Sequence, residues 1–186
     1  MGWWRKFVSW WRRILRKIIH WISCTFGLKP PEGNPPTASQ ELTIKNDFPN
    51  LQTWSVTGAS TTSYNCIAWS VGITNQWIWP GNTVADFDAF YASHGWSIAN
   101  NCNREYKKRK VALYANNSDP NDCTHSSRET HDCGWDESKL GSLERIMHIR
   151  DELEGRYYGT VIRCYEKRDD NANVDLFREK VANHGQ

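Results

Sequence analysis

At residues 63–72 the chain reads Ser63-Tyr64-Asn65-Cys66-Ile67-Ala68-Trp69-Ser70-Val71-Gly72, which places one cysteine between a polar, turn-prone run and an apolar run. This order predicts a helix that begins at or near Cys66. The free N–H groups and the dipole of a helix start favour a thiolate over a thiol. Cys66 is therefore a candidate nucleophile. The alternative is a small buried thiol, because free cysteines are among the most buried residues.

The segments around this helix predict an α+β order of elements. Helices are expected at residues 83–94, 142–153 and 174–183. Strands are expected at residues 110–115, 123–129 and 158–165, and a further strand begins at residue 134. The clearest boundary is Thr83, because a threonine cap followed three residues later by Asp86 is a helix-start signal.

Several motifs together resemble an uncharacterised, mostly bacterial domain family over residues 48–163. The motifs are Phe48-Pro49-Asn50-Leu51, Tyr64-Asn65-Cys66-Ile67-Ala68-Trp69, Val111-Ala112-Leu113-Tyr114-Ala115, Thr124-His125, and Trp135 with Ser138-Lys139-Leu140-Gly141. The run around Cys66 is also similar to the catalytic-helix start of papain-like cysteine peptidases and, more distantly, of NlpC-type cell-wall peptidases. The resemblance implies an α+β, papain-like domain in which a Cys-bearing helix packs on a small antiparallel sheet.

The papain-like order implies a catalytic set in which Cys66 is the nucleophile and His125 is its base. Asp136 and Ser138 are the candidates for the group that orients the histidine, since they share one face of a strand. The NlpC-type histidine position holds Lys110 here, so either His125 is the base, as in the papain-like order, or the site is inactive. The implied activity is a thiol hydrolase or acyltransferase acting on an amide or ester bond of a peptide or small substrate, without a cofactor. The alternative is a non-catalytic, membrane-recruited binding or effector domain.

Aromatic residues and an asparagine near Cys66 are expected to form or rim a concave site, and core packing is the alternative. The predicted pocket residues are Asn65, Trp69, Trp77, Trp79 and Trp135. A metal site is not expected. Cys123, His125, His131 and Cys133 have zinc-ligand spacing, but a turn at residues 132–134 would scatter them. A Cys123–Cys133 disulfide remains an alternative for an exported protein.

Residues 1–28 predict an amphipathic helix with a basic polar face. Residues 1–29 carry seven Lys or Arg and no acid, whereas the remaining chain carries 16 basic and 21 acidic residues. Such a helix suits the plane of an anionic membrane surface, and we expect a peripheral membrane protein. The predicted membrane-binding residues are Trp3, Trp4, Arg5, Lys6, Trp11, Arg12, Arg13, Arg16 and Lys17. The alternative is a helix that docks on the domain.

Other roles for this helix fit less well. The basic residues interrupt every apolar run, which argues against a transmembrane span and a signal peptide. No nucleic-acid partner is expected, because the helix lacks the polar residues that read bases. Residues 29–41 predict a stiff linker with four prolines, and residues 42–186 are expected to form one domain.

Overall fold

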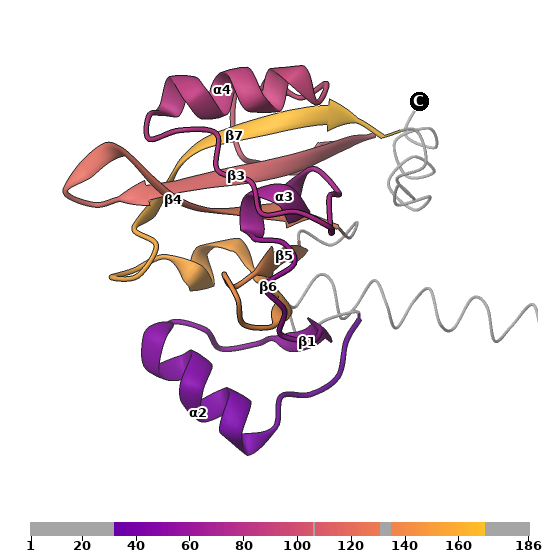
Figure 1. The fold of residues 1–186 in the computed structure, drawn as a ribbon, viewed down its shortest axis with the longest axis vertical. Helices are drawn as coiled ribbons and strands as arrows, with labels where there is room; N and C mark the ends of the chain where they lie inside the picture. The colour runs from indigo at the N-terminus through magenta and orange to yellow at the C-terminus, as the bar shows by residue number, and fades with distance from the viewer. Residues whose placement is uncertain (1–31, 106, 131–134, 170–186) are drawn as a thin grey trace, which may run out of the picture.

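A computed structural model describes residues 32–105, 107–130 and 135–169 (Figure 1). Seven strands form one antiparallel sheet in the order β1-β6-β5-β4-β3-β7-β2. The strands are β1 (Ser55–Gly58), β2 (Ser97–Ile98), β3 (Lys108–Asn116), β4 (Asp119–Glu129), β5 (Trp135–Lys139), β6 (Arg145–Ile149) and β7 (Thr160–Arg168).

Strand β3 is the buried centre of this sheet, between β4 and β7. Its residues 110–115 are inaccessible to solvent, which explains why the run from Val111 to Ala115 is apolar on both faces. Val111 and Leu113 pack in one hydrophobic cluster, and Ala112 and Tyr114 pack in another. Because successive side chains of a strand point to opposite faces, the two clusters cover opposite faces of the sheet.

Short helices cover these faces. They are α2 (Ala38–Asp47), α3 (Cys66–Ser70), α4 (Val84–Ser93) and a 3-10 turn η1 (Arg150–Leu153). Helix α4 lies along β3 and β7, and α2 lies at the other end of the molecule near β1 (Figure 1). The sequence signal at Thr83 is confirmed, because Thr83 and Asp86 form a capping box at the start of α4.

The predicted papain-like architecture is wrong. In place of a cysteine-bearing helix on a small sheet, the described residues form a seven-stranded antiparallel sheet, and the helix at Cys66 has only five residues. The helix predicted at residues 142–153 is also wrong. Strand β6 and the 3-10 turn η1 occupy most of that segment, and β6 pairs with its hairpin neighbour β5 and with β1, which is distant in sequence.

The N-terminal boundary of the domain also differs from the prediction. Part of the predicted linker belongs to the fold, since Asn34 pairs with Val56 and α2 begins at Ala38. The predicted amphipathic helix at residues 1–28, its membrane-binding residues and the helix predicted at residues 174–183 lie outside the described residues. Within the described part of the chain, no helix is long and apolar enough to cross a membrane.

Candidate functional site

A pocket of about 360 Å³ opens at the start of α3, where side chains from both hydrophobic clusters approach each other. Four of the residues predicted from the sequence line it together: Asn65, Cys66, Trp77 and Trp79. The other lining residues are Asp47, Phe48, Thr124, Leu140, Gly141, Ser142, Leu143, Tyr157 and Tyr158.

Asn65 positions the two tryptophans. Its side-chain oxygen caps α3 by accepting from the N–H of Ala68 at 3.1 Å, and it also accepts from the N–H of Ile78 at 3.3 Å. Its amide group donates to the carbonyl of Ile78 at 2.6 Å. Ile78 stands between Trp77 and Trp79, so the cap residue of the helix holds the tryptophan loop beside Cys66.

Three packed aromatic rings line another part of the pocket. The ring of Phe48 lies 5.4 Å from that of Tyr157 and 4.9 Å from that of Tyr158. Tyr157 is 55% exposed, whereas Phe48 and Tyr158 are buried. The pocket therefore has aromatic groups contributed by three segments that are 29 to 110 residues apart in the chain.

Cys66 is a buried free thiol at the N-terminus of α3. Burial raises the pKa of the Cys66 thiol to about 11, although the backbone N–H groups of Ser126 and Ile67 and the charge of Lys139 act in the opposite direction. The helix start therefore does favour the anion, as the sequence suggests, but desolvation outweighs it. At neutral pH the group is a thiol.

His125 is fully buried on β4 and takes part in a different network. Its Nε2 lies 3.0 Å from the hydroxyl of Ser138, which lies 2.8 Å from Nε2 of His148. Its ring stacks on Tyr158 at 3.9 Å. Burial, followed by the charge of His148, lowers the pKa of His125 well below its ordinary value, so it is a neutral imidazole.

The structure does not bring Cys66 and His125 into hydrogen-bond contact. The hydroxyl of Ser126 donates to the carbonyl of Cys66, so α3 packs on the face to which Ser126 points. His125 precedes Ser126 in β4, and its side chain therefore points to the other face. There it packs against Tyr114 and Tyr158, which belong to the second cluster.

The two candidates for the orienting group have separate partners. Ser138 does lie beside His125, as described above. Asp136 instead forms a bidentate ion pair with Arg150, with both nitrogen–oxygen distances at 2.8 Å, and accepts a hydrogen bond from Ser127. Asp136 is fully buried and thus part of the fold's interior.

The two remaining predicted pocket residues lie elsewhere. The ring of Trp69 is close to two guanidinium groups, 4.4 Å from Arg128 and 4.1 Å from Arg145. Trp135 is buried in the sheet and pairs with Ile149. Trp135 therefore packs in the core, which was the alternative expected for these tryptophans.

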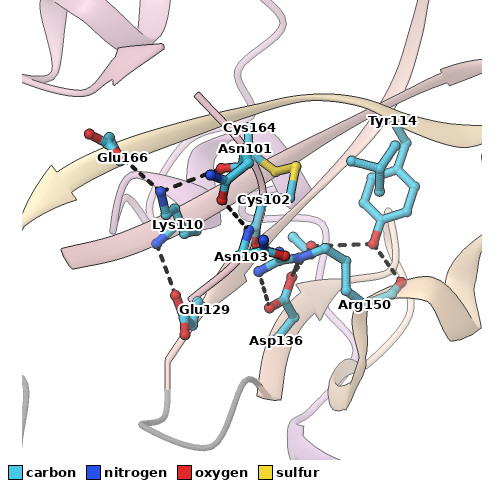
Figure 2. Close-up of a disulfide and its surroundings, with 12 residues drawn as sticks. Asn101, Cys102, Asn103, Lys110, Tyr114, Glu129, Asp136, Arg150, Cys164 and Glu166 are labelled. Carbon is cyan, nitrogen blue, oxygen red and sulfur yellow. Dashed lines mark hydrogen bonds and ion pairs between the residues drawn. A yellow bond between two sulfur atoms is a disulfide. The ribbon is translucent and has the colours of Figure 1, made fainter. Parts of the chain in front are cut away.

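A disulfide joins Cys102 to Cys164 across 62 residues (Figure 2). Figure 2 shows two cations beside it, the buried Lys110 and the partly buried Arg150. The Nζ of Lys110 donates to Glu105 and Glu166, each at 2.6 Å. The sequence did not indicate this bridge. Of the predicted zinc-spaced set, two members lie outside the described residues, and no group of three potential metal ligands is found among those described.

The lining residues that sequence reasoning missed include the one charged residue, Asp47, and three aromatic ones, Phe48, Tyr157 and Tyr158. Phe48 belongs to the motif Phe48-Pro49-Asn50-Leu51, which is part of the family resemblance. That motif was the sequence signal that could have pointed to Phe48 as a site residue. Asp47 and the tyrosine pair have no local pattern, because only the tertiary fold brings them to Cys66.

Residues 55–166 match the family described as Domain of unknown function (DUF7689). The expected membership of an uncharacterised family is thereby confirmed, whereas the likeness to papain-like and NlpC-type peptidases has no support among the matches. No curated protein and no solved structure matches the chain.

Proposed function

The chain belongs to the DUF7689 family, a domain of unknown function, and we propose that it is a ligand-binding module that takes its ligand in the pocket at Cys66. The observation that carries the proposal is the cluster of partly exposed aromatic rings around that pocket. Trp77 is 52% exposed and Trp79 is 43% exposed, although both belong to a loop held in place by Asn65. Concave, mostly apolar sites with few polar groups are typical of ligand pockets.

Titration with small probes tests the binding function. With tryptophans replaced by 5-fluorotryptophan, we expect the fluorine resonances of Trp77 and Trp79 to shift when millimolar choline or its neutral isostere 3,3-dimethyl-1-butanol is added. Trp135 is an internal control whose buried ring should not respond. If neither compound shifts Trp77 or Trp79, the pocket is not a binding site for groups of this size.

Thiol chemistry at Cys66 on an amide or ester is a second candidate function. It is favoured by the place of Cys66 on the pocket wall, where a bound substrate could reach the sulfur. It is opposed by the raised pKa of Cys66 and by the position of His125 on the other face of the sheet.

Alkylation as a function of pH distinguishes the two functions. Burial raises the pKa of both Cys66 and Cys123 to about 11, so we expect iodoacetamide to label both slowly at pH 7. The rate at each should rise as the pH approaches 11, because the thiolate is the reacting form. His125→Ala should leave the Cys66 rate unchanged. Preferential labelling of Cys66 near neutral pH, lost in His125→Ala, would establish the nucleophile instead.

Recruitment to an anionic membrane surface by residues 1–28 completes the proposal. Its support is the sequence pattern, in which basic and apolar residues occupy different helix faces. Replacing Arg12 and Arg16 by glutamine should weaken binding to anionic vesicles about 30-fold, because each cation near such a surface is worth on the order of 1 kcal/mol.

Vesicle flotation of the full chain measures this effect. A matched control replaces two cations of the domain, the partly exposed Lys45 and the exposed Lys167, by glutamine and should bind as the unaltered chain does. Equal weakening in both variants would mean that net charge, and not the N-terminal segment, determines membrane binding.

A further inference from the structure

We propose that the pocket at Cys66 selects a quaternary or alkylated ammonium group, an inference that rests on the proposed binding function. A pocket built mostly from aromatic rings suits several apolar ligands. The charge of the pocket lining and the exposure of its rings favour, among these ligands, one that carries a positive charge.

The pocket is lined by aromatic rings with exposed faces. Trp77, Trp79 and Tyr157 are the large exposed aromatic side chains of the described residues, and all three line this one pocket. Phe48 and Tyr158 add two further rings. Aromatic faces attract cations through their quadrupole, and cages of such rings recognise quaternary ammonium groups, each contact being worth about 0.5–2 kcal/mol.

The charge of the residues that line the pocket also favours a cation. Among the described residues that line the pocket, Asp47 is the only charged one. It is also the last residue of α2. The C-terminal end of a helix carries a partial negative charge, which acts in the same direction as the carboxylate. An anionic ligand would meet a negative potential here, whereas a cation with an apolar body would be attracted.

A nearby cation does not reverse this conclusion. Lys139 lies close enough to Cys66 to influence its pKa, but it does not line the pocket. Its Nζ is engaged by the carbonyl oxygens of Gly141 and Leu143, and its side chain is buried. The ammonium of Lys139 therefore donates to two backbone carbonyls of the pocket wall and is not itself part of the lining.

Comparison of choline with 3,3-dimethyl-1-butanol isolates the charge, because the two have the same shape. In the fluorine titration of the full chain, we expect choline to bind at least about tenfold more tightly. Asp47→Asn should remove most of that preference and leave the affinity for the alcohol unchanged. The matched control Glu41→Gln removes a carboxylate from the same helix outside the pocket and should have no effect on either affinity.

The same titration tests the rings separately from the carboxylate. Trp77→Leu keeps an apolar side chain at an exposed position but loses the aromatic face, so choline affinity should fall more than alcohol affinity. Trp77→Leu should not unfold the domain, because Trp77 is half-exposed. Equal losses for both compounds would overturn the proposed role of the ring.

The outcomes separate this inference from the proposed function. If the two compounds bind equally, the module stands and the cation inference is overturned. If neither binds, the proposed function itself fails. A free ammonium compound and a lipid headgroup share this chemistry. Flotation with phosphatidylcholine vesicles distinguishes them, since a headgroup site predicts binding that soluble choline competes away and Asp47→Asn lowers.

Discussion

Replacing Arg150 by methionine should lower the free energy of unfolding by about 3–5 kcal/mol, because it leaves the carboxylate of Asp136 buried without its ion-pair partner. Asp136 is inaccessible to solvent, and Arg150 engages both of its oxygens. A third Arg150 nitrogen donates to the carbonyl of Cys102 at 2.6 Å, so the substitution also leaves that acceptor unpaired. Denaturant unfolding at constant slope measures the loss.

Two further variants separate the buried charge from general damage. Asp136→Asn combined with Arg150→Met should recover at least half of the lost stability, because no uncompensated charge remains while the amide oxygen can still accept from Ser127. Arg163→Met is the matched control. It breaks the ion pair between Arg163 and Asp88, whose side chains are 35% and 27% exposed. It should lower the free energy of unfolding by less than about 1 kcal/mol. Equal losses in both single variants would contradict this account.

This result bears on function because Asp136 stood among the residues that the papain-like resemblance implied for catalysis. A loss of folding, and not a loss of activity in a folded protein, is what the ion pair with Arg150 predicts for Asp136. Ser138 and His125 do contact each other, but in a buried network that leads to His148.

Local signals predicted those parts of the fold whose structure depends on neighbours in sequence. The strand predicted at residues 110–115 lies within β3, because the apolar run from Val111 to Ala115 suits a strand buried on both faces. The start of α4 follows from Thr83 and Asp86, which bond to each other's backbone within one turn.

The misassigned segment at residues 142–153 depends on tertiary pairing, including one strand distant in sequence, β1. Residues 142–153 have apolar residues at helical spacing, yet Ile146, Met147 and His148 are all buried consecutively in β6. Three adjacent buried residues need cover on both faces of the strand, which an interior strand of a sheet with a hydrophobic cluster on each face has and a helix on a surface does not. Tertiary pairing therefore overrides the local pattern.

For the candidate site, too, the sequence predicted only the residues that lie close together in the chain. Asn65, Cys66, Trp77 and Trp79 lie within 15 residues of one another, so their grouping follows from one capped turn and the loop it holds. The opposite wall comes from α2 and from the segment before β7, and sequence alone carries no sign that these approach Cys66. The placement of His125 depended on the register of β4, which a one-residue shift reverses.

Loss of the Cys102–Cys164 disulfide should lower the free energy of unfolding by about 4 kcal/mol. The bridge closes a loop of 62 residues, and the entropy that it removes from the unfolded chain grows with loop length. We expect the same decrease from a reducing agent and from Cys102→Ala combined with Cys164→Ala. The reducing agent should have no effect on the double variant, which serves as its control, and a further decrease there would mean that reduction acts elsewhere.

The disulfide and the Arg150 pair should not act independently. The segment that contains Cys102 supplies carbonyl acceptors to both cations beside the disulfide, Cys102 to Arg150 and Asn101 to Lys110. Once the bridge is removed, this segment is held less firmly. Arg150 is then already expected to lose its hydrogen bond to the carbonyl of Cys102. In a double-mutant cycle, Arg150→Met should therefore cost about 0.5–3 kcal/mol less in the protein without the disulfide. Strict additivity would mean that the loop stays in place without its bridge, and that the disulfide acts on the unfolded chain alone.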